Sequence, residues 1–177
     1  GAKDFILWNP PIIDEAKATR RSSNTEAAFL FSELVRQGIR TLAFARTRKL
    51  TELIYKYSKQ QLAEPLLMQR IKPYRAGYLP EERRQIEQEL FRGQLIGVVA
   101  TTALELGVDI GDLEATILTG YPGSIASTWQ QAGRSGRRTG KSLSFLIGLD
   151  NPLDQYFMRY PQFLFHRSFE NALTNPD

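Results

Sequence analysis

Short apolar runs alternate along the chain with longer amphipathic stretches, and this alternation predicts an α/β fold. Several of the runs are apolar on both faces, as buried parallel strands require. Because parallel strands are joined by crossovers, the pattern indicates a mostly parallel central sheet with helices on both faces. The expected strands are Phe5–Trp8, Ile39–Ala45, Ile71–Arg75, Leu95–Ala100, Ala115–Thr119 and Leu143–Gly148.

The helices between these strands are marked by residues that favour helix ends. Ser23 and Glu26 have the spacing of a capping box, and Gly38 follows the same helical stretch. Pro80 suits the first turn of a helix, and Gly93 follows its last turn. The expected helices are Asn24–Gln37, Thr47–Gln61, Pro80–Phe91, Ser124–Ala132 and Pro152–Tyr160.

The length of 177 residues predicts a single main domain with a substantial core. We expect residues 1–21 to hold an N-terminal strand and an interdomain linker, because Pro10 and Pro11 disfavour helix there. The domain itself is expected over residues 22–160. Residues 161–177 begin with an aromatic-rich stretch and are expected to lead into further sequence.

Composition excludes several classes of site. The chain has no cysteine, which removes disulfides, thiolate nucleophiles and cysteine-bound zinc. His166 is the only histidine, so no metal site is expected. The net charge of +4 permits nucleic-acid binding without requiring it. No 18-residue apolar run and no signal-peptide pattern occurs, so we expect an intracellular, cytoplasmic domain without a membrane partner.

The octet Gln130–Arg137 holds two arginines, Arg134 and Arg137, interleaved with glycines. A guanidinium fork matches phosphate oxygens, and glycines allow the backbone to approach a ligand closely. An arginine finger that neutralises a transferring phosphoryl group needs such residues. A solvated basic turn after a helix is the competing interpretation, and it is the more common one for a basic cluster taken alone.

A second polar segment directly follows the expected strand Leu95–Ala100. The hydroxyl of Thr101, beside backbone amides at a helix start, suits a nucleic-acid phosphate, although a plain N-cap is the alternative. Thr102 and Glu105 also fit a capping box, which is a purely structural role. Ligands of parallel sheets bind outside the carboxyl ends of the strands, so this segment and the octet are expected to face one edge.

The two segments resemble motifs V and VI of superfamily two helicases, in the order and at the spacing of that family. The motif VI pattern Gln-x-x-Gly-Arg-x-Gly-Arg is met by residues 130–137. The motif V pattern is met by Ala100, Thr101, Gly107 and Asp109. Residues 41–48 resemble motif IV. Residues 74–83 resemble the element that follows it, with Arg75 where the family often has histidine.

The sequence of residues 103–111 and 151–156 is similar to that of MrfA/YprA-type DNA helicases. The resemblance implies a RecA-like three-layer domain, the second of a two-domain motor whose N-terminal RecA-like domain is its partner. It implies Arg137 as the arginine finger and Arg134 as its companion on the phosphates. Residues implied on the ATP side are Gln130, Gly133, Asp109 and Gly107, and those implied on nucleic acid are Thr101, Thr102, Arg46 and Arg48.

The resemblance also implies DNA as the nucleic acid, a role in DNA repair, and ATP with Mg²⁺ held mainly by the first domain. Residues 135–142 come one residue short of a P-loop and enter a strand instead of a helix. The chain alone is therefore expected not to hydrolyse ATP. An RNA helicase of the DEAD-box kind remains an alternative, against which Gln130 and Thr102 argue. A non-catalytic binding module is another, disfavoured by Arg134 and Arg137.

Overall fold

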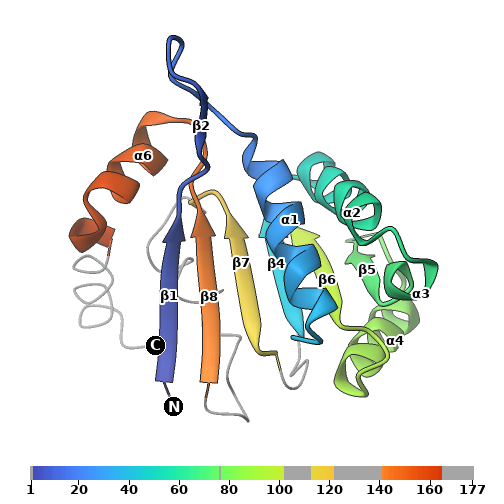
Figure 1. Ribbon diagram of the computed structural model, residues 1–177. Coiled ribbons are helices and arrows are strands. Elements are labelled where there is room, and N and C mark those ends of the chain that lie inside the picture. The colour runs from blue at the N-terminus through green and yellow to red at the C-terminus, as the bar shows by residue number, and fades with distance from the viewer. Residues whose placement is uncertain (1, 76, 102–112, 122–140, 165–177) are drawn as a thin grey trace.

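A six-stranded sheet, parallel throughout, forms the centre of the computed structural model, which describes residues 2–75, 77–101, 113–121 and 141–164 (Figure 1). The strand order is β1-β8-β7-β4-β6-β5, so β4 lies inside the sheet while β1 and β5 are its edges. The strands are β1 (Ala2–Trp8), β4 (Thr41–Ala45), β5 (Ile71–Tyr74), β6 (Gly97–Thr101), β7 (Ala115–Thr119) and β8 (Lys141–Ile147).

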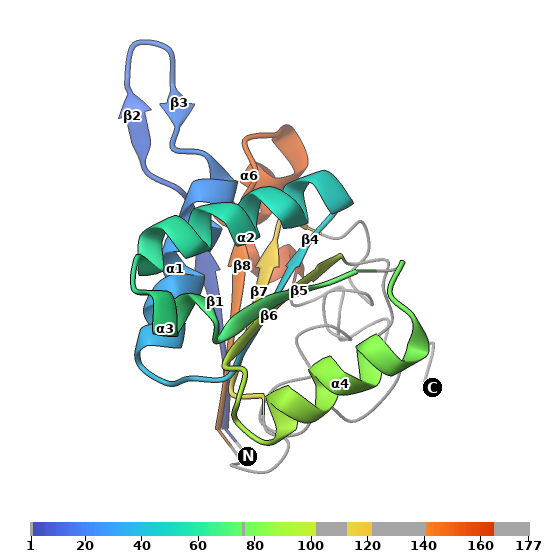
Figure 2. The ribbon, with the colours of Figure 1, turned by 90° about the vertical axis from the view of Figure 1, so that its right-hand side faces the viewer.

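Helices cover both faces of this sheet, which confirms the expected three-layer RecA-like fold (Figures 1 and 2). On one face, α1 (Ser23–Arg36), α2 (Arg48–Leu62) and the short α3 (Pro65–Met68) pack through a cluster that includes Phe31 and Ile54. On the other face, α4 (Pro80–Phe91) and α6 (Pro152–Arg159) contribute Leu90 and Phe157 to a second cluster.

The structure confirms the expected strands and four of the expected helices, with small shifts at their ends. β7 and α4 have the expected bounds, and α1 and α2 each differ by one residue at each end. The expected helix Ser124–Ala132 lies outside the described residues. The short helix α3 was not expected, because its few apolar residues are too short a stretch to show helical periodicity.

The segment expected as a linker folds back on itself as a β-hairpin. β2 (Ile12–Asp14) and β3 (Thr19–Arg20) pair in antiparallel fashion and project beyond the carboxyl ends of the strands (Figure 1). At the turn, Asp14 Oδ1 accepts from the Ala16 amide at 3.1 Å, and Ala18 adopts a φ of 53°. The division of the chain into domains remains a prediction.

Glu26 acts differently from the expected capping box. The N-cap of α1 is Ser22, which makes no side-chain cap hydrogen bond. Glu26 is buried and accepts one hydrogen bond from Trp8 Nε1 and one from Arg21 Nη1, both at 3.2 Å. The expectation of a Ser23–Glu26 box is therefore wrong, because the carboxylate meets an indole and a guanidinium from other segments. These bonds tie the end of β1 and the exit of the hairpin to α1.

The described residues contain neither a membrane-spanning helix nor a cluster of metal-binding side chains. No helix in this part of the chain is long and apolar enough to cross a lipid bilayer. No three His, Cys, Asp or Glu side chains in the same part gather closely enough to hold a metal ion.

At Gly97, side chains of α1 pack directly against the backbone of β6, so Gly97→Ala should destabilise the domain. An added Cβ would lie 2.8 Å from Phe31 Cε2 and 2.9 Å from Val35 Cγ2. Overpacking of this kind costs about 1–3 kcal/mol. The free energy of unfolding, measured in urea, should fall by that amount.

Gly77→Ala is the matched control, because nothing lies within 4 Å of the added Cβ. We expect its effect to stay within about 0.5 kcal/mol. Equal stability of the two variants would contradict the described packing of α1 on β6.

Candidate functional site

The carboxyl ends of β4, β6 and β7 meet at one edge of the sheet. Ala45 of β4 pairs with Thr101 of β6, and Phe44 pairs with Leu118 of β7. The residues that follow these strands therefore lie side by side. Within the described residues, this confirms that the start of the motif V segment and the chain leading toward the motif VI segment face the same edge.

Thr101 is the last residue of β6 and is half-buried. Its position at the carboxyl edge is the one expected for a residue that contacts a phosphate. Thr102, Gly107 and Asp109 lie outside the described residues, as do Gln130, Gly133, Arg134 and Arg137. The structure therefore describes what flanks these residues, and their assigned roles remain predictions.

Arg46 follows β4 and is engaged within the domain. Its guanidinium donates through Nε and Nη2 to the carbonyl oxygen of Tyr121, at 3.0 and 2.5 Å. A guanidinium has five N–H donors, so donors remain for a ligand. What the structure shows is a link between the loops after β4 and β7, whereas a contact of Arg46 with nucleic acid remains a prediction.

Asp154 holds the same residue, Tyr121, from the opposite side. Its Oδ2 atom accepts from the Tyr121 amide at 3.1 Å and from the Leu149 amide at 2.8 Å. Its own amide donates to Oδ1 of Asn151, the N-cap of α6, at 2.8 Å. Asp154 is only 2% exposed, so water does not compete for these bonds.

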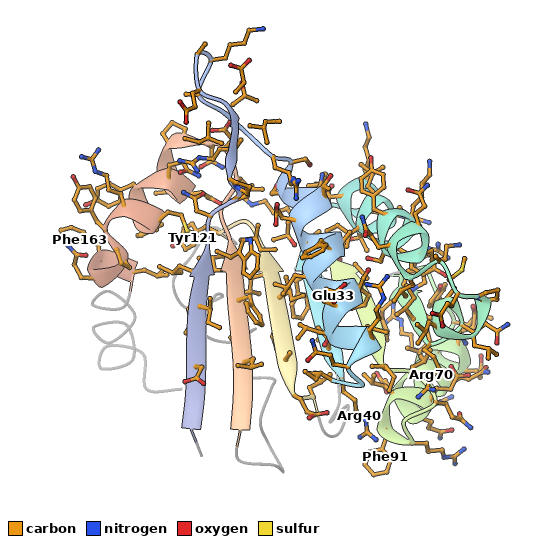
Figure 3. The ribbon with its side chains drawn as sticks, in the orientation of Figure 1. Glu33, Arg40, Arg70, Phe91, Tyr121 and Phe163 are labelled. Atoms are coloured by element: carbon orange, nitrogen blue, oxygen red, sulfur yellow. The ribbon has the colours of Figure 1, made fainter. Side chains whose placement is uncertain are left out.

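The backbone of Tyr121 is thus fixed through both its N–H and its C=O group; we name Arg46, Tyr121 and Asp154 the Tyr121 clamp. Figure 3 shows Tyr121 at the carboxyl edge of the sheet, near α6. Its ring packs against Phe157 with the ring centroids 4.9 Å apart. The clamp fixes the point from which the chain enters residues 122–140, which include the arginine octet.

Asp154 was not among the site residues expected from the sequence. A signal was available, because Asn151-Pro152-Leu153-Asp154 places an acid three residues after an N-cap asparagine, the pattern of a capping box. That signal identifies a helix start, and it does not reveal the contact with Tyr121.

Arg48 is the first residue of α2 and is exposed. The N-cap of this helix is Thr47, whose side chain accepts from the Leu50 amide at 3.1 Å. This cap fixes the start of α2 directly after the carboxyl end of β4. Arg48 therefore stands at the expected edge with its charged group accessible, as a phosphate contact requires.

Arg75, which directly follows β5, is held by an ion pair. It donates through Nη2 to Oε2 of Glu52 at 2.8 Å, through Nε to Oε1 of the same carboxylate, and through Nη1 to the Tyr78 hydroxyl at 3.1 Å. The hydrogen bond from Arg75 lowers the pKa of Glu52. Reciprocally, Glu52 raises the pKa of Arg75. The pair joins α2 to the end of β5.

Comparison with known proteins identifies the family. The model of the helicase conserved C-terminal domain matches residues 26–139. The chain therefore belongs to the family of helicase C-terminal domains.

Two helicases are similar to this chain over almost its whole length. The ATP-dependent helicase YprA of Bacillus subtilis is 46% identical over 177 residues, which are all of this chain and 24% of that protein. The ATP-dependent helicase hrq1 of Schizosaccharomyces pombe is 40% identical over 98% of this chain and 17% of its own length. The chain thus spans about a quarter or less of these relatives.

Solved structures agree with this assignment. The crystal structure of the DUF1998 helicase MrfA bound to DNA superimposes with a TM-score of 0.88 at 46% identity, over 94% of this chain and 22% of that one. The Escherichia coli DEAD-box protein SrmB matches with a TM-score of 0.63 at 16% identity, over 83% of this chain and 77% of that one. The second likeness shows the RecA-like fold alone.

Asp154→Ala should destabilise the domain by about 2–3 kcal/mol, because it leaves the amides of Tyr121 and Leu149 without their acceptor. Asp154→Asn keeps one side-chain oxygen and should cost less. Urea unfolding of both variants measures the difference. If Asp154→Ala were as stable as the parent, the Tyr121 clamp would contribute nothing to stability.

The Glu52–Arg75 pair should make stability depend on pH in the acid range. The pKa of Glu52 is lower in the folded state than the ordinary value of 4.5, so the pair stabilises the fold above that value. This contribution is lost as the pH falls from 4.5 through the lower folded pKa. The stability gap between the parent and Glu52→Gln, from urea unfolding at several pH values, should be open at neutral pH and close in acid. A gap that widened in acid would contradict the lowered pKa.

Proposed function

We propose that this chain is the second motor domain of an ATP-dependent DNA helicase. The single observation that carries the proposal is the shared carboxyl edge, where Thr101 ends β6 and the Tyr121 clamp fixes the approach to Arg134 and Arg137. In such an arrangement, one edge of the sheet meets both the phosphates of the nucleotide and the phosphates of the nucleic acid.

The names and the bound ligands of the relatives support this proposal. YprA and hrq1 are named ATP-dependent helicases. MrfA has been crystallised with DNA, and also with DNA and the nucleotide analogue AMPPNP, where the likeness to this chain gives a TM-score of 0.86. Because the chain covers only part of these proteins, their activities come to it as a proposal.

In the proposed mechanism, Arg137 is the arginine finger and Arg134 its companion. Their guanidinium groups fit phosphate oxygens and stay charged at any physiological pH. ATP with Mg²⁺ supplies a phosphoryl group whose charge changes during hydrolysis, and neutralising that charge is the finger's task. Gln130, Gly133, Asp109 and Gly107 would surround the nucleotide on this side of the cleft.

The nucleotide itself would be held mainly by the N-terminal RecA-like domain. This chain has no Gly-x-x-x-x-Gly-Lys-Ser/Thr sequence, the loop whose amides and lysine cradle phosphates. The N-terminal domain is thus the first partner of this chain. The chain alone should not hydrolyse ATP.

The proposed grip on DNA is through its backbone. The hydroxyl of Thr101 would donate to a phosphate, with Thr102 beside it and the exposed Arg48 adding charge at the start of α2. Arg46 would contribute the N–H groups that Tyr121 does not use. Phosphate contacts give affinity and salt dependence without sequence preference. A role in DNA repair belongs to the proposal by resemblance alone.

Arg137→Ala tests the proposal in the full-length protein that contains this chain. We expect DNA-stimulated ATP hydrolysis to fall by roughly 100-fold or more, because the charge of the transition state loses its neutralising partner. Binding of ATP and of DNA should be unchanged. The measurement is steady-state phosphate release with and without single-stranded DNA, and an RNA strand of the same sequence distinguishes the two nucleic acids.

Arg138→Ala is the matched control, since it removes a neighbouring arginine that the motif does not include. It should keep most of the turnover. Unchanged turnover in Arg137→Ala, or no ATP hydrolysis by the parent protein, would refute the motor assignment and favour a binding module instead.

A further inference from the structure

A basic hollow lies along α2 on the side that faces the β5 edge of the sheet. Its volume is about 740 Å³. Figure 2 looks onto this edge, where α2 runs above β5 and α4 lies below it. The hollow is lined by Arg48, Lys49, Glu52, Leu53, Tyr55, Lys56, Lys59 and Arg75.

The charges in this hollow are strongly unbalanced. Its only carboxylate is Glu52, and both oxygens of that carboxylate are taken by Arg75. Among the residues that the structure describes, no carboxylate lies within 4.0 Å of the ammonium groups of Lys49, Lys56 or Lys59. Three lysines therefore share one surface without an ion-paired carboxylate.

This clustering is unfavourable for the helix itself. Lys56 and Lys59 stand at i,i+3 spacing, where like charges repel. Arg48 stands in the first turn of α2, where the helix dipole disfavours a positive charge. A bound polyanion would reduce both the repulsion between the lysines and the unfavourable interaction of Arg48 with the helix dipole. The charge of this surface therefore suits a polyanion.

A second hollow of about 480 Å³ continues the first along β5 and shares Tyr55 and Lys59 with it. Farther along, it is lined by Lys72, which pairs with Glu89 at 2.9 Å. At the junction, Lys59 Nζ lies 4.8 Å from the centroid of the Tyr55 ring. The two hollows adjoin at Tyr55 and Lys59, and we name them together the α2 groove.

The α2 groove begins at the proposed nucleic-acid edge. Arg48 directly follows the loop after β4, and β4 pairs with β6 through Ala45 and Thr101. From Arg48 to Lys59 the helix advances about 16 Å, at 1.5 Å per residue. A strand that crosses the edge at Thr101 would therefore meet a row of cations leading away from it, down the side of the domain.

We propose that the α2 groove binds the phosphate backbone of a single nucleic-acid strand beyond the edge at Thr101. Arg48, Lys49, Lys56 and Lys59 supply the positive charge that a phosphate backbone requires. This proposal rests on the proposed function, since it extends the same nucleic-acid path. It gives the domain a second contact with the strand, outside the segment between the two motor domains.

The test is the salt dependence of binding by the full-length protein that contains this chain, without nucleotide. Lys56→Gln together with Lys59→Gln should reduce the slope of log K against log salt by about 1.4 on a strand of roughly 30 nucleotides, since each contact contributes about 0.7. The affinity advantage of the parent should then be about seven-fold greater at 50 mM salt than at 200 mM. Binding to a strand of roughly 3 nucleotides should be unchanged, because at about 3.4 Å per nucleotide it spans about 10 Å and cannot cover the distance from Arg48 to Lys59.

Arg84→Gln with Arg92→Gln is the charge-matched control, because both arginines are exposed on α4, across the sheet from α2. It should leave both slopes unchanged. An equal loss in the control would make the effect a general one of net charge and overturn the proposal. An equal loss on short and long strands would place Lys56 and Lys59 in the main path and also overturn it.

If the Lys56→Gln, Lys59→Gln variant had the salt dependence of the parent on both strands, the groove would not bind the strand and the proposal would be refuted. These results are independent of ATP turnover. If Arg137→Ala abolished turnover while the groove variant bound every strand as the parent does, the groove alone would be wrong. If the groove variant behaved as expected while Arg137→Ala kept full turnover, the motor assignment alone would be wrong.

Discussion

The backbone of Tyr121, held from two sides, is the constraint on which the carboxyl edge depends. Arg46 takes its carbonyl and Asp154 takes its amide, so the loops that follow β4, β7 and β8 are fixed to one another. Gly120, directly before it, has a φ of 87° and lies so close to Leu149 that a Cβ would be 2.7 Å from Cδ1. The chain therefore leaves β7 in one direction only.

Three carboxylates in this domain link elements that are distant in the sequence. Glu26 joins β1 and the hairpin to α1, Glu52 joins α2 to β5, and Asp154 joins α6 to the Tyr121 loop. Two of the three, Glu26 and Glu52, are paired with the arginines Arg21 and Arg75. By contrast, Lys49 and Lys56 of α2 are exposed. The modest net charge of +4 is unevenly distributed, since the hollow along α2 is lined by several cations and by Glu52 as its only carboxylate.

The elements of this fold were predictable because their signals are local. β7 and α4 were predicted to the residue, since apolar periodicity and the flanking Pro80 and Gly93 are read within a few positions. The hairpin at residues 12–20 was not, because two prolines and a polar stretch are also typical of a linker. Its pairing depends on a turn at Asp14, not on buried apolar residues.

The sequence motifs were sufficient to identify the family, but they did not reveal the contacts that hold the motif segments in place. Thr101 was expected directly after a strand and is the last residue of β6, a shift of one residue. Its place at the carboxyl edge was predictable because a threonine after an apolar run is visible in the sequence. Glu26 and Asp154 were not understood, because their partners Trp8 and Tyr121 lie 18 and 33 residues away. Such contacts are created by the tertiary fold and leave no periodic trace.

The pairing of β1 with β8 has a consequence for how the domain is made. Ala2 pairs with Lys141, so the first strand has no partner until the last strand of the sheet has left the ribosome. At a synthesis rate of about 5–20 residues per second, that wait is roughly 7–28 s. During that interval Leu7 and Trp8 have no sheet to join, and the nascent chain must be kept from aggregating by other means. The edge formed by β1 is thus the last part of the sheet that can form during translation.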